Sequence, residues 1–300
     1  MDARTTVPQE VFCLQTSIFD WFGYRLDAQT RFRMIAEAGF DQVLLWWGDE
    51  YAQTAGPKET QPAIARAHGL AVENVHAPFA DANLLWQDGQ DGDDLLQRYL
   101  ACVADCAAHA IPTVVMHLTR GDTPPPISAR GMDRLRRLAE AAERWQVTVA
   151  LENLRRPAYL AAVYTQVDSP RLRLCYDSGH QHCYTPTQDI LACHGQRLAA
   201  LHLHDNDASD DQHRLPGDGT LDWTALTGRL RALRYPGPVT LEVSSECSPR
   251  HERETPEAFL RDAFARARAL ATALEDGTAP VFPQEKETNK KATTVAEKER

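Results

Sequence analysis

The chain has 300 residues, of which 43% are hydrophobic and 25% charged, so one large α/β barrel or two ordinary globular domains are expected. The formal net charge of −10 argues against a broad nucleic-acid-binding face, and no apolar run is long enough to cross a membrane. The first residues lack the basic-then-apolar layout of a signal peptide, so a cytoplasmic location without nucleic-acid or membrane partners is expected.

Short aliphatic or β-branched runs alternate along the chain with segments of helical periodicity. Strands are expected at Val11–Ile18, Gln42–Trp47, Val72–His76, Thr113–His117, Val147–Glu152, Leu172–Asp177, Leu198–Leu203 and Val239–Glu242. Helices are expected at Ala28–Ala38, Gln61–His68, Asp93–His109, Arg130–Arg144, Ala158–Tyr164, Pro186–His194, Trp223–Leu233 and Pro256–Leu274.

Eight successive strand–helix units predict a single (β/α)8 TIM barrel over residues 1–277. A doubly wound open sheet is the alternative, but the first strand-to-helix turn lacks a glycine-rich phosphate loop. Residues 278–300 end in a highly charged stretch with almost no large apolar side chains, which predicts a disordered C-terminal tail.

Six of the predicted strands end at, or just after, a histidine or an acidic residue. The residues at these strand ends are His76, His117, Glu152, Asp177, His202 and Glu242. The C-terminal ends of barrel strands meet at one mouth, where active sites of this fold lie. Imidazole and carboxylate ligands suit a divalent cation such as Mn, Co, Mg, Fe or Zn. A metal site at the barrel mouth is therefore expected.

The seventh strand and its loop carry the densest group of such residues. His202 and His204 are two residues apart, so in a strand they point to the same face. Asp211 and His213 follow in a polar loop. Either histidine is a candidate ligand by this pattern.

These motifs, in this order, resemble the xylose isomerase-like barrel superfamily, which contains sugar and sugar-phosphate isomerases and epimerases and endonuclease IV. The matching motifs are HAPF at His76, MHL at His117, ENL at Glu152, YDSGH at Tyr176–His180, HLHD at His202–Asp205, DQH at Asp211–His213 and LEVS around Glu242. They span roughly residues 10 to 275.

The resemblance to the ketose epimerases implies one metal ion held by Glu152, Asp177, His202 and Glu242. His202 is preferred to His204 because it makes the family's H-x-x-D spacing with Asp205. The implied reaction is proton transfer next to a carbonyl through a metal-stabilised enediolate, with Glu152 and Glu242 as the catalytic pair. Homodimers or homotetramers are usual among the resembling enzymes.

Four residues are candidate contacts for a sugar or sugar-phosphate substrate: His180, His204, Arg155 and Trp46. Arg155, with Arg156 beside it, could hold a hydroxyl, carboxylate or phosphate group, although a solvent-exposed pair is equally expected. One of the tandem tryptophans, Trp46 and Trp47, should face the barrel mouth and the other the helices; core packing is the alternative for both.

The resemblance to endonuclease IV leaves a second hypothesis open. Its pattern adds possible metal ligands at His76, His117, His180, Asp211 and His213, so between one and three ions are expected. A cluster of ions suits phosphodiester hydrolysis, here of a small molecule. A barrel that binds a ligand without turnover is a third reading.

Overall fold

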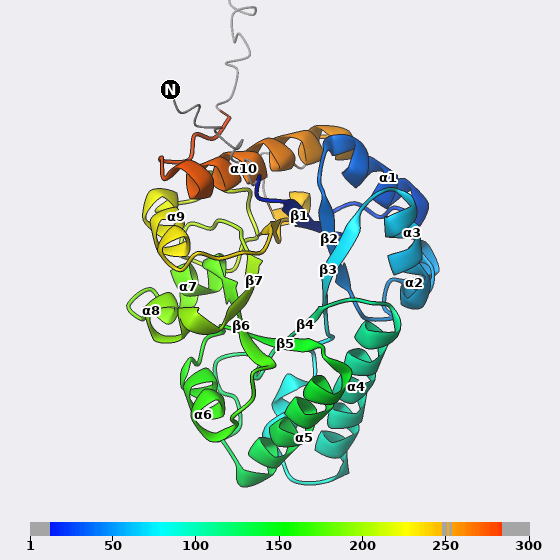
Figure 1. Cartoon of the computed structure of the whole chain (residues 1–300), viewed down its shortest axis with the longest axis vertical. Helices are drawn as coiled ribbons and strands as arrows, with labels where there is room; N and C mark the ends of the chain where they lie inside the picture. Colours follow the sequence, from blue (N-terminus) through cyan, green and yellow to red (C-terminus); the bar gives the residue numbers. More distant parts are fainter. Residues whose placement is uncertain (1–12, 248–250, 252–253, 284–300) are drawn as a thin grey trace, which may run out of the picture.

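The computed structural model describes residues 13–247, 251 and 254–283. In this part of the chain eight parallel strands form one sheet that curls into a barrel (Figure 1). The strands are β1 (Thr16–Phe19), β2 (Gln42–Trp46), β3 (Ala71–His76), β4 (Thr113–Met116), β5 (Thr148–Glu152), β6 (Leu172–Asp177), β7 (Leu198–His202) and β8 (Val239–Leu241). Their order is β7-β6-β5-β4-β3-β2-β1-β8, and a bridge between β7 and β8 all but closes the ring.

The closing bridge is made by the residue that directly follows β7. The Leu203 amide donates to the Thr240 carbonyl at 2.9 Å, and the Glu242 amide donates to the Leu203 carbonyl at 3.1 Å. The barrel expected from the sequence is thus confirmed, and the last strand-to-strand contact places the end of β7 beside the end of β8.

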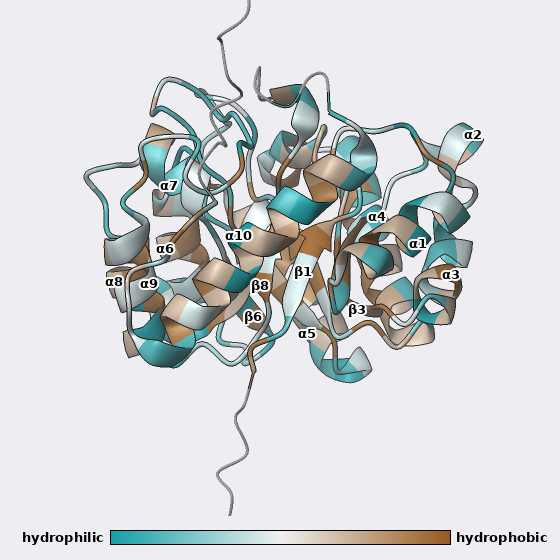
Figure 2. Cartoon of the chain, turned by 90° about the horizontal axis from the view of Figure 1, so that it is seen from above, coloured by the Kyte–Doolittle hydropathy of each residue, from teal (hydrophilic) through white to brown (hydrophobic). Residues whose placement is uncertain are grey.

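Helices cover the outside of the barrel, and in Figure 2 their ribbons carry teal, hydrophilic stretches as well as brown, hydrophobic ones. They are α1 (Ala28–Ala38), α2 (Ala52–Ala55), α3 (Gln61–Ala67), α4 (Gln90–Ala108), α5 (Ala129–Trp145), α6 (Ala158–Gln166), α7 (Ser178–Tyr184), α8 (Ile190–His194), α9 (Trp223–Ala232) and α10 (Pro256–Asp276), with short 3-10 turns at Lys58–Thr60, Ala82–Trp86, Gly195–Arg197 and Ser245–Cys247. Among the helices of the described ranges, none is both long and apolar enough to cross a membrane.

The helical segment after β6 differs from the expected helix at Pro186–His194. The structure has α7 immediately after β6 and only a short α8 at Ile190–His194. The Asp177 side chain accepts the His180 amide and so caps α7, while Asp189 caps α8 in the same way. Pro186 separates the two helices because the residue before a proline is disfavoured in helical conformation.

The structure describes the first residues of the segment that the sequence assigns to the tail. Phe282, which falls in the predicted tail, packs edge-on against Trp223 with ring centroids 6.0 Å apart. Its apolar ring can bury surface that the charged residues after it cannot. Residues 284–300, the charged part of that tail, lie outside the described residues.

A layer of small side chains fills the barrel beneath the strand ends. Val115, Ala150, Cys175 and Ala200 form a buried cluster of their own. Each lies two positions before a residue singled out in the sequence (His117, Glu152, Asp177 and His202, respectively), so the two sets share the inward face. These small side chains therefore lie directly beneath the polar residues inside the barrel.

Candidate active site

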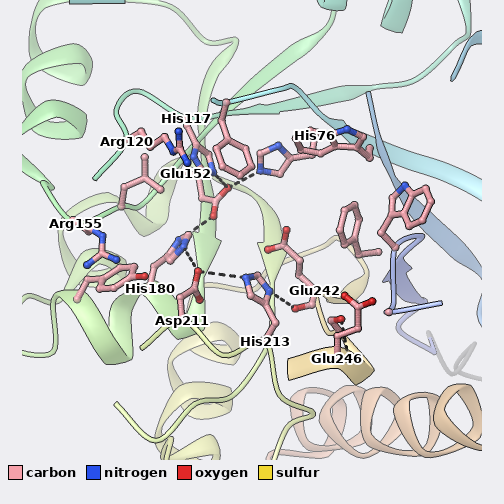
Figure 3. Close-up of a pocket in the computed structure, with 18 of the residues that line it drawn as sticks. His76, His117, Arg120, Glu152, Arg155, His180, Asp211, His213, Glu242 and Glu246 are labelled. Atoms are coloured by element: carbon pink, nitrogen blue, oxygen red, sulfur yellow. Dashed lines mark hydrogen bonds and ion pairs between the residues drawn. The ribbon is translucent and has the colours of Figure 1, made fainter. Parts of the chain in front are cut away.

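Glu152, at the end of β5, is the centre of a buried polar cluster (Figure 3). Its Oε2 atom lies 3.2 Å from His76 Nε2 and 3.1 Å from His117 Nε2, and its Oε1 atom lies 3.0 Å from His180 Nδ1. Glu152 is 1% exposed. Three imidazoles from β3, the β4 loop and α7 thus converge on one carboxylate.

A second group links this carboxylate to the other side of the barrel. His202 Nδ1 lies 3.0 Å from Glu242 Oε2 and 3.5 Å from Glu152 Oε2. One ligand atom from each of Glu152, Asp177, His202 and Glu242 lies within 4.8 Å of the other three. The four residues that the sequence placed on separate strands are therefore brought together.

The donor set fits a divalent cation. Three buried carboxylates face one another without a buried lysine or arginine among them, and such a group needs compensating positive charge. The His202 ring is fully buried, and apart from the 3.0 Å approach of its Nδ1 atom to Glu242 Oε2, neither ring nitrogen makes a hydrogen bond with a described residue. Two ligands of one ion are at most about 4.4 Å apart when each lies about 2.2 Å from it, so a small inward adjustment would complete a site.

The electrostatics of the cluster keep the carboxylates ionised. Burial alone would raise the pKa of Glu152, but His117 and His202 hold this pKa well below its usual value. Burial opposes ionisation of Glu242 too, and His202 again lowers its pKa. Ionised carboxylates are the form that binds a cation and the form that accepts a proton.

Asp177 is held in place from three directions. Its Oδ1 atom accepts the His180 amide at 2.6 Å, and His204 Nε2 lies 3.1 Å from both of its carboxylate oxygens. Asn153 receives the Asp177 amide at 2.7 Å and donates to the Asp177 carbonyl at 2.9 Å. Asn153 supports the site, but the sequence analysis quoted it only within the ENL motif.

His204 lies behind Asp177 and not in the cavity. β7 ends at His202, so the alternation of a strand does not carry on to His204. The ring of His204 is fully buried, and it stacks on His213 with centroids 4.1 Å apart. Asp205, the other end of the H-x-x-D spacing, accepts Trp223 Nε1 at 2.8 Å and the Gly217 amide at 2.8 Å, so it fixes the loop after β7.

Replacing Gly179 by Ala should disturb this support. A Cβ at position 179 would lie 1.8 Å from Cε1 of the His204 ring, which is enclosed and cannot move aside. We expect a loss of about 1–3 kcal/mol of unfolding free energy and weaker binding of divalent metal, measured by denaturant unfolding and metal titration.

Gly228→Ala is the matched control for this substitution. Gly228 is in the exposed part of α9, and its added Cβ would meet nothing within 4 Å. The control should leave metal binding unchanged and stabilise the helix by about 0.5–1 kcal/mol. Equal metal affinity in both variants would contradict the role given to His204.

Asp211 and His213 extend the cluster along the loop after β7. Asp211 Oδ2 lies 3.1 Å from His180 Nε2 and 3.3 Å from His213 Nε2. His213 Nδ1 lies 2.9 Å from the Glu242 carbonyl. Burial alone would lower the pKa of His213, but Asp211 raises it to about 10. All of the histidines and acids proposed from the sequence as extra ligands therefore contact the central group or its neighbours.

A cavity of about 580 Å³ opens above the cluster. Trp46 and Phe79 line one side, whereas Trp47 points toward α4 and donates to Asp105 Oδ2 at 2.9 Å. Trp86 lies in the core and donates to the Leu118 carbonyl at 2.6 Å. One tandem tryptophan faces the mouth and the other the helices, as expected.

Arg155 lines the cavity, but its guanidinium already has two partners within the protein. Its guanidinium lies 3.2 Å from Asp122 Oδ1 and 3.5 Å from the ring centroid of Tyr184. Arg156 instead donates to the Asp122 carbonyl and does not line the cavity.

Sequence reasoning missed several lining residues, namely Trp21, Tyr24, Arg25, Tyr51, Thr119, Arg120, Tyr184, Ser244 and Glu246. All of them follow the ends of predicted strands, and this position could have marked them in the sequence as candidate lining residues.

Comparison with known proteins places the chain in a family. Residues 32–269 match the sequence pattern of the xylose isomerase-like TIM barrel family. The chain is 30% identical over 288 residues to protein y4fM of Sinorhizobium fredii, covering 81% of this chain and 87% of that protein. It is 25% identical over 280 residues to fructoselysine 3-epimerase of Escherichia coli O157:H7, covering 86% and 98%.

Among solved structures, L-ribulose 3-epimerase superposes with a TM-score of 0.71 at 16% identity, covering 88% of this chain and 96% of that one. This likeness concerns the fold. On the match over residues 32–269, the chain belongs to the xylose isomerase-like TIM barrel family.

Proposed function

We propose that the protein is a divalent-metal-dependent sugar isomerase or epimerase. The proposal rests on one observation: potential ligand atoms of Glu152, Asp177, His202 and Glu242 all lie within 4.8 Å of one another. The fructoselysine 3-epimerase, which matches over most of both chains, supports the same class of reaction. The substrate we propose is a small sugar or sugar phosphate that enters the cavity above these residues.

In this mechanism Glu152 and Glu242 move the proton. The neighbouring histidines lower the pKa values of both carboxylates, so both are ionised at neutral pH, which is the form a general base needs. Glu152 ends β5 and Glu242 directly follows β8, with His202 between them, so a substrate above His202 would have one on either side. A bound divalent cation would supply the positive charge that polarises the carbonyl and stabilises the negative charge formed on proton removal.

Other residues bind and orient the sugar. His180, held between Glu152 and Asp211, would position a substrate oxygen. Trp46 offers an aromatic face to the sugar, and Arg155 a guanidinium at the far side of the cavity. We assign His204 to holding Asp177, because its Nε2 atom lies 3.1 Å from both carboxylate oxygens of that residue.

Metal removal tests the proposal directly. Treatment with a chelator should abolish the incorporation of deuterium from solvent into a panel of ketoses, because the enolised form would lose its compensating charge. Adding back Mn²⁺ or Co²⁺ should restore exchange, and elemental analysis should then find one ion per chain. Deuterium exchange that continues after complete metal removal would contradict the proposed metal-dependent reaction.

A phosphodiesterase with several ions is the second candidate, and a specific observation favours it. Two further groups could each hold an ion: His76, His117 and Glu152 form one, and His204, His213 and Glu242 form the other. Two or three Zn²⁺ or Fe ions per chain, together with hydrolysis of a small phosphodiester, would select this function over isomerisation.

A further inference from the structure

The cavity above the metal-ligand cluster is larger than a single sugar needs. A free hexose has about a dozen non-hydrogen atoms, and even at the ~30 Å³ of one water molecule for each, it fills at most about 360 Å³. More than roughly a third of the 580 Å³ cavity would remain. The remaining space is large enough for a second part of the substrate.

The lining has two sides that come from opposite parts of the barrel. Thr119, Arg120, Arg155 and Tyr184 follow β4, β5 and β6. The other side is built by loops after the neighbouring strands β2, β1 and β8 and comprises Trp21, Tyr24, Arg25, Tyr51, Ser244 and Glu246. We call this second set the β1–β8 side. In Figure 3 Glu246 lies away from Arg120 and Arg155, beyond Glu242.

The β1–β8 side has a preformed aromatic wall. The rings of Trp21 and Tyr51 have centroids 3.8 Å apart, and Tyr51 is 43% exposed. The Arg31 guanidinium lies 4.3 Å from the Trp21 ring, and a buried ion pair with Asp20 fixes that arginine. The wall therefore does not have to be ordered by the ligand, which favours binding.

The loops after β1 and β8 are held together at this point. The Ser245 amide donates to the Phe22 carbonyl at 3.1 Å, and a Cβ on Gly23 would lie 2.3 Å from the Ser245 hydroxyl oxygen. Arg25 and Glu246, one from each loop, line the cavity on this side. Neither makes an ion pair with another described residue, and they do not pair with each other.

We propose that the β1–β8 side is a second subsite, which binds an amino-acid substituent attached to the sugar. This rests on the proposed function for the sugar half. A cation and an anion that line the same side of a cavity, and that pair with no described residue, are complementary to a group that carries both a carboxylate and an ammonium. Arg25 would hold the carboxylate, Glu246 the ammonium, and the Trp21–Tyr51 wall the aliphatic chain that links them to the sugar.

Three substrates separate this subsite from the sugar site. They are a ketose joined through an amine to the side chain of an amino acid, the same ketose joined to an alkylamine of equal length, and the free ketose. With metal-loaded full-length protein, kcat/KM from solvent deuterium incorporation should be at least about tenfold higher for the amino-acid conjugate than for the alkylamine conjugate. Binding of both conjugates is also measured by calorimetry, independently of turnover.

Charge-removing variants test the two assigned residues. Arg25→Gln and Glu246→Gln should each reduce the preference for the amino-acid conjugate by about fivefold or more, in kcat/KM and in affinity. Glu140→Gln, an exposed position on α5, is the matched control and should leave the preference unchanged. Equal use of both conjugates, or a preference that survives both substitutions, would overturn the subsite while leaving the isomerase in place. Absence of exchange with every substrate would refute the proposed function, and calorimetry would still decide the subsite.

Discussion

Replacing Glu242 by Gln is expected to reduce turnover by about 10²–10⁴-fold or more. Glutamine keeps the size of the side chain but cannot accept the proton, and it removes one negative charge from the proposed ligand set. Glu242 is 8% exposed and its Oε2 atom lies 3.0 Å from His202 Nδ1, so the substitution acts directly on the group of residues around His202. The measurement is solvent deuterium incorporation into the best ketose, together with metal content.

Two comparisons make the Glu242 result interpretable. Glu140→Gln changes the charge equally, but on an exposed helix position far from the barrel mouth, and should keep full activity. Retained metal with lost exchange assigns Glu242 to proton transfer, whereas loss of both assigns it to metal binding. Full activity of Glu242→Gln would remove this residue from the mechanism.

Replacing Asp20 by Ala is expected to lower the unfolding free energy by about 3–5 kcal/mol. Asp20 and Arg31 form an ion pair in which both side chains are fully buried. Burial raises the pKa of Asp20, and Arg31 offsets this rise in part. Without the carboxylate, the Arg31 charge stays buried with only the Leu26 carbonyl at 3.2 Å as a neutral acceptor.

The control for the buried ion pair is an exposed ion pair on α1, the helix that carries Arg31. Arg33 and Glu37 form an exposed pair, with side chains 48% and 60% exposed, and Glu37→Ala should cost at most about 0.5 kcal/mol. Denaturant unfolding of both variants gives the comparison. Similar losses in the two would show that the buried pair contributes no more than a surface pair does.

The Asp20→Ala substitution should also change the lining of the cavity. Its Oδ1 atom accepts the Trp46 amide at 3.1 Å, and Arg31 underlies Trp21. The aromatic wall should therefore become less ordered in Asp20→Ala, and substrate affinity should fall together with stability.

The barrel and its polar mouth were predictable from local patterns. Short apolar runs ending in His117, Glu152 or Asp177 signal strands whose carboxyl ends carry function, and the parallel fold collects those ends. Helix α1 has the bounds that were predicted from Gly39 as a helix-stop residue, and in the structure Asp27 caps its start and Gly39, at φ 108°, ends it. Helix α7 was missed because its cap, Asp177, is also the last residue of a strand, and local periodicity cannot assign one residue to both.

The sequence by itself therefore determined the repeated strand–helix order, the inward residues at the strand ends and the N/O character of the site. Only the tertiary structure decided which of these residues touch. It separated His202, beside Glu152 and Glu242, from His204, behind Asp177, because the two-residue alternation ends where β7 ends. It likewise placed Arg25 and Glu246 along one cavity, since the loops that carry them are more than two hundred residues apart in the sequence and are brought to the same side by the pairing of β1 with β8.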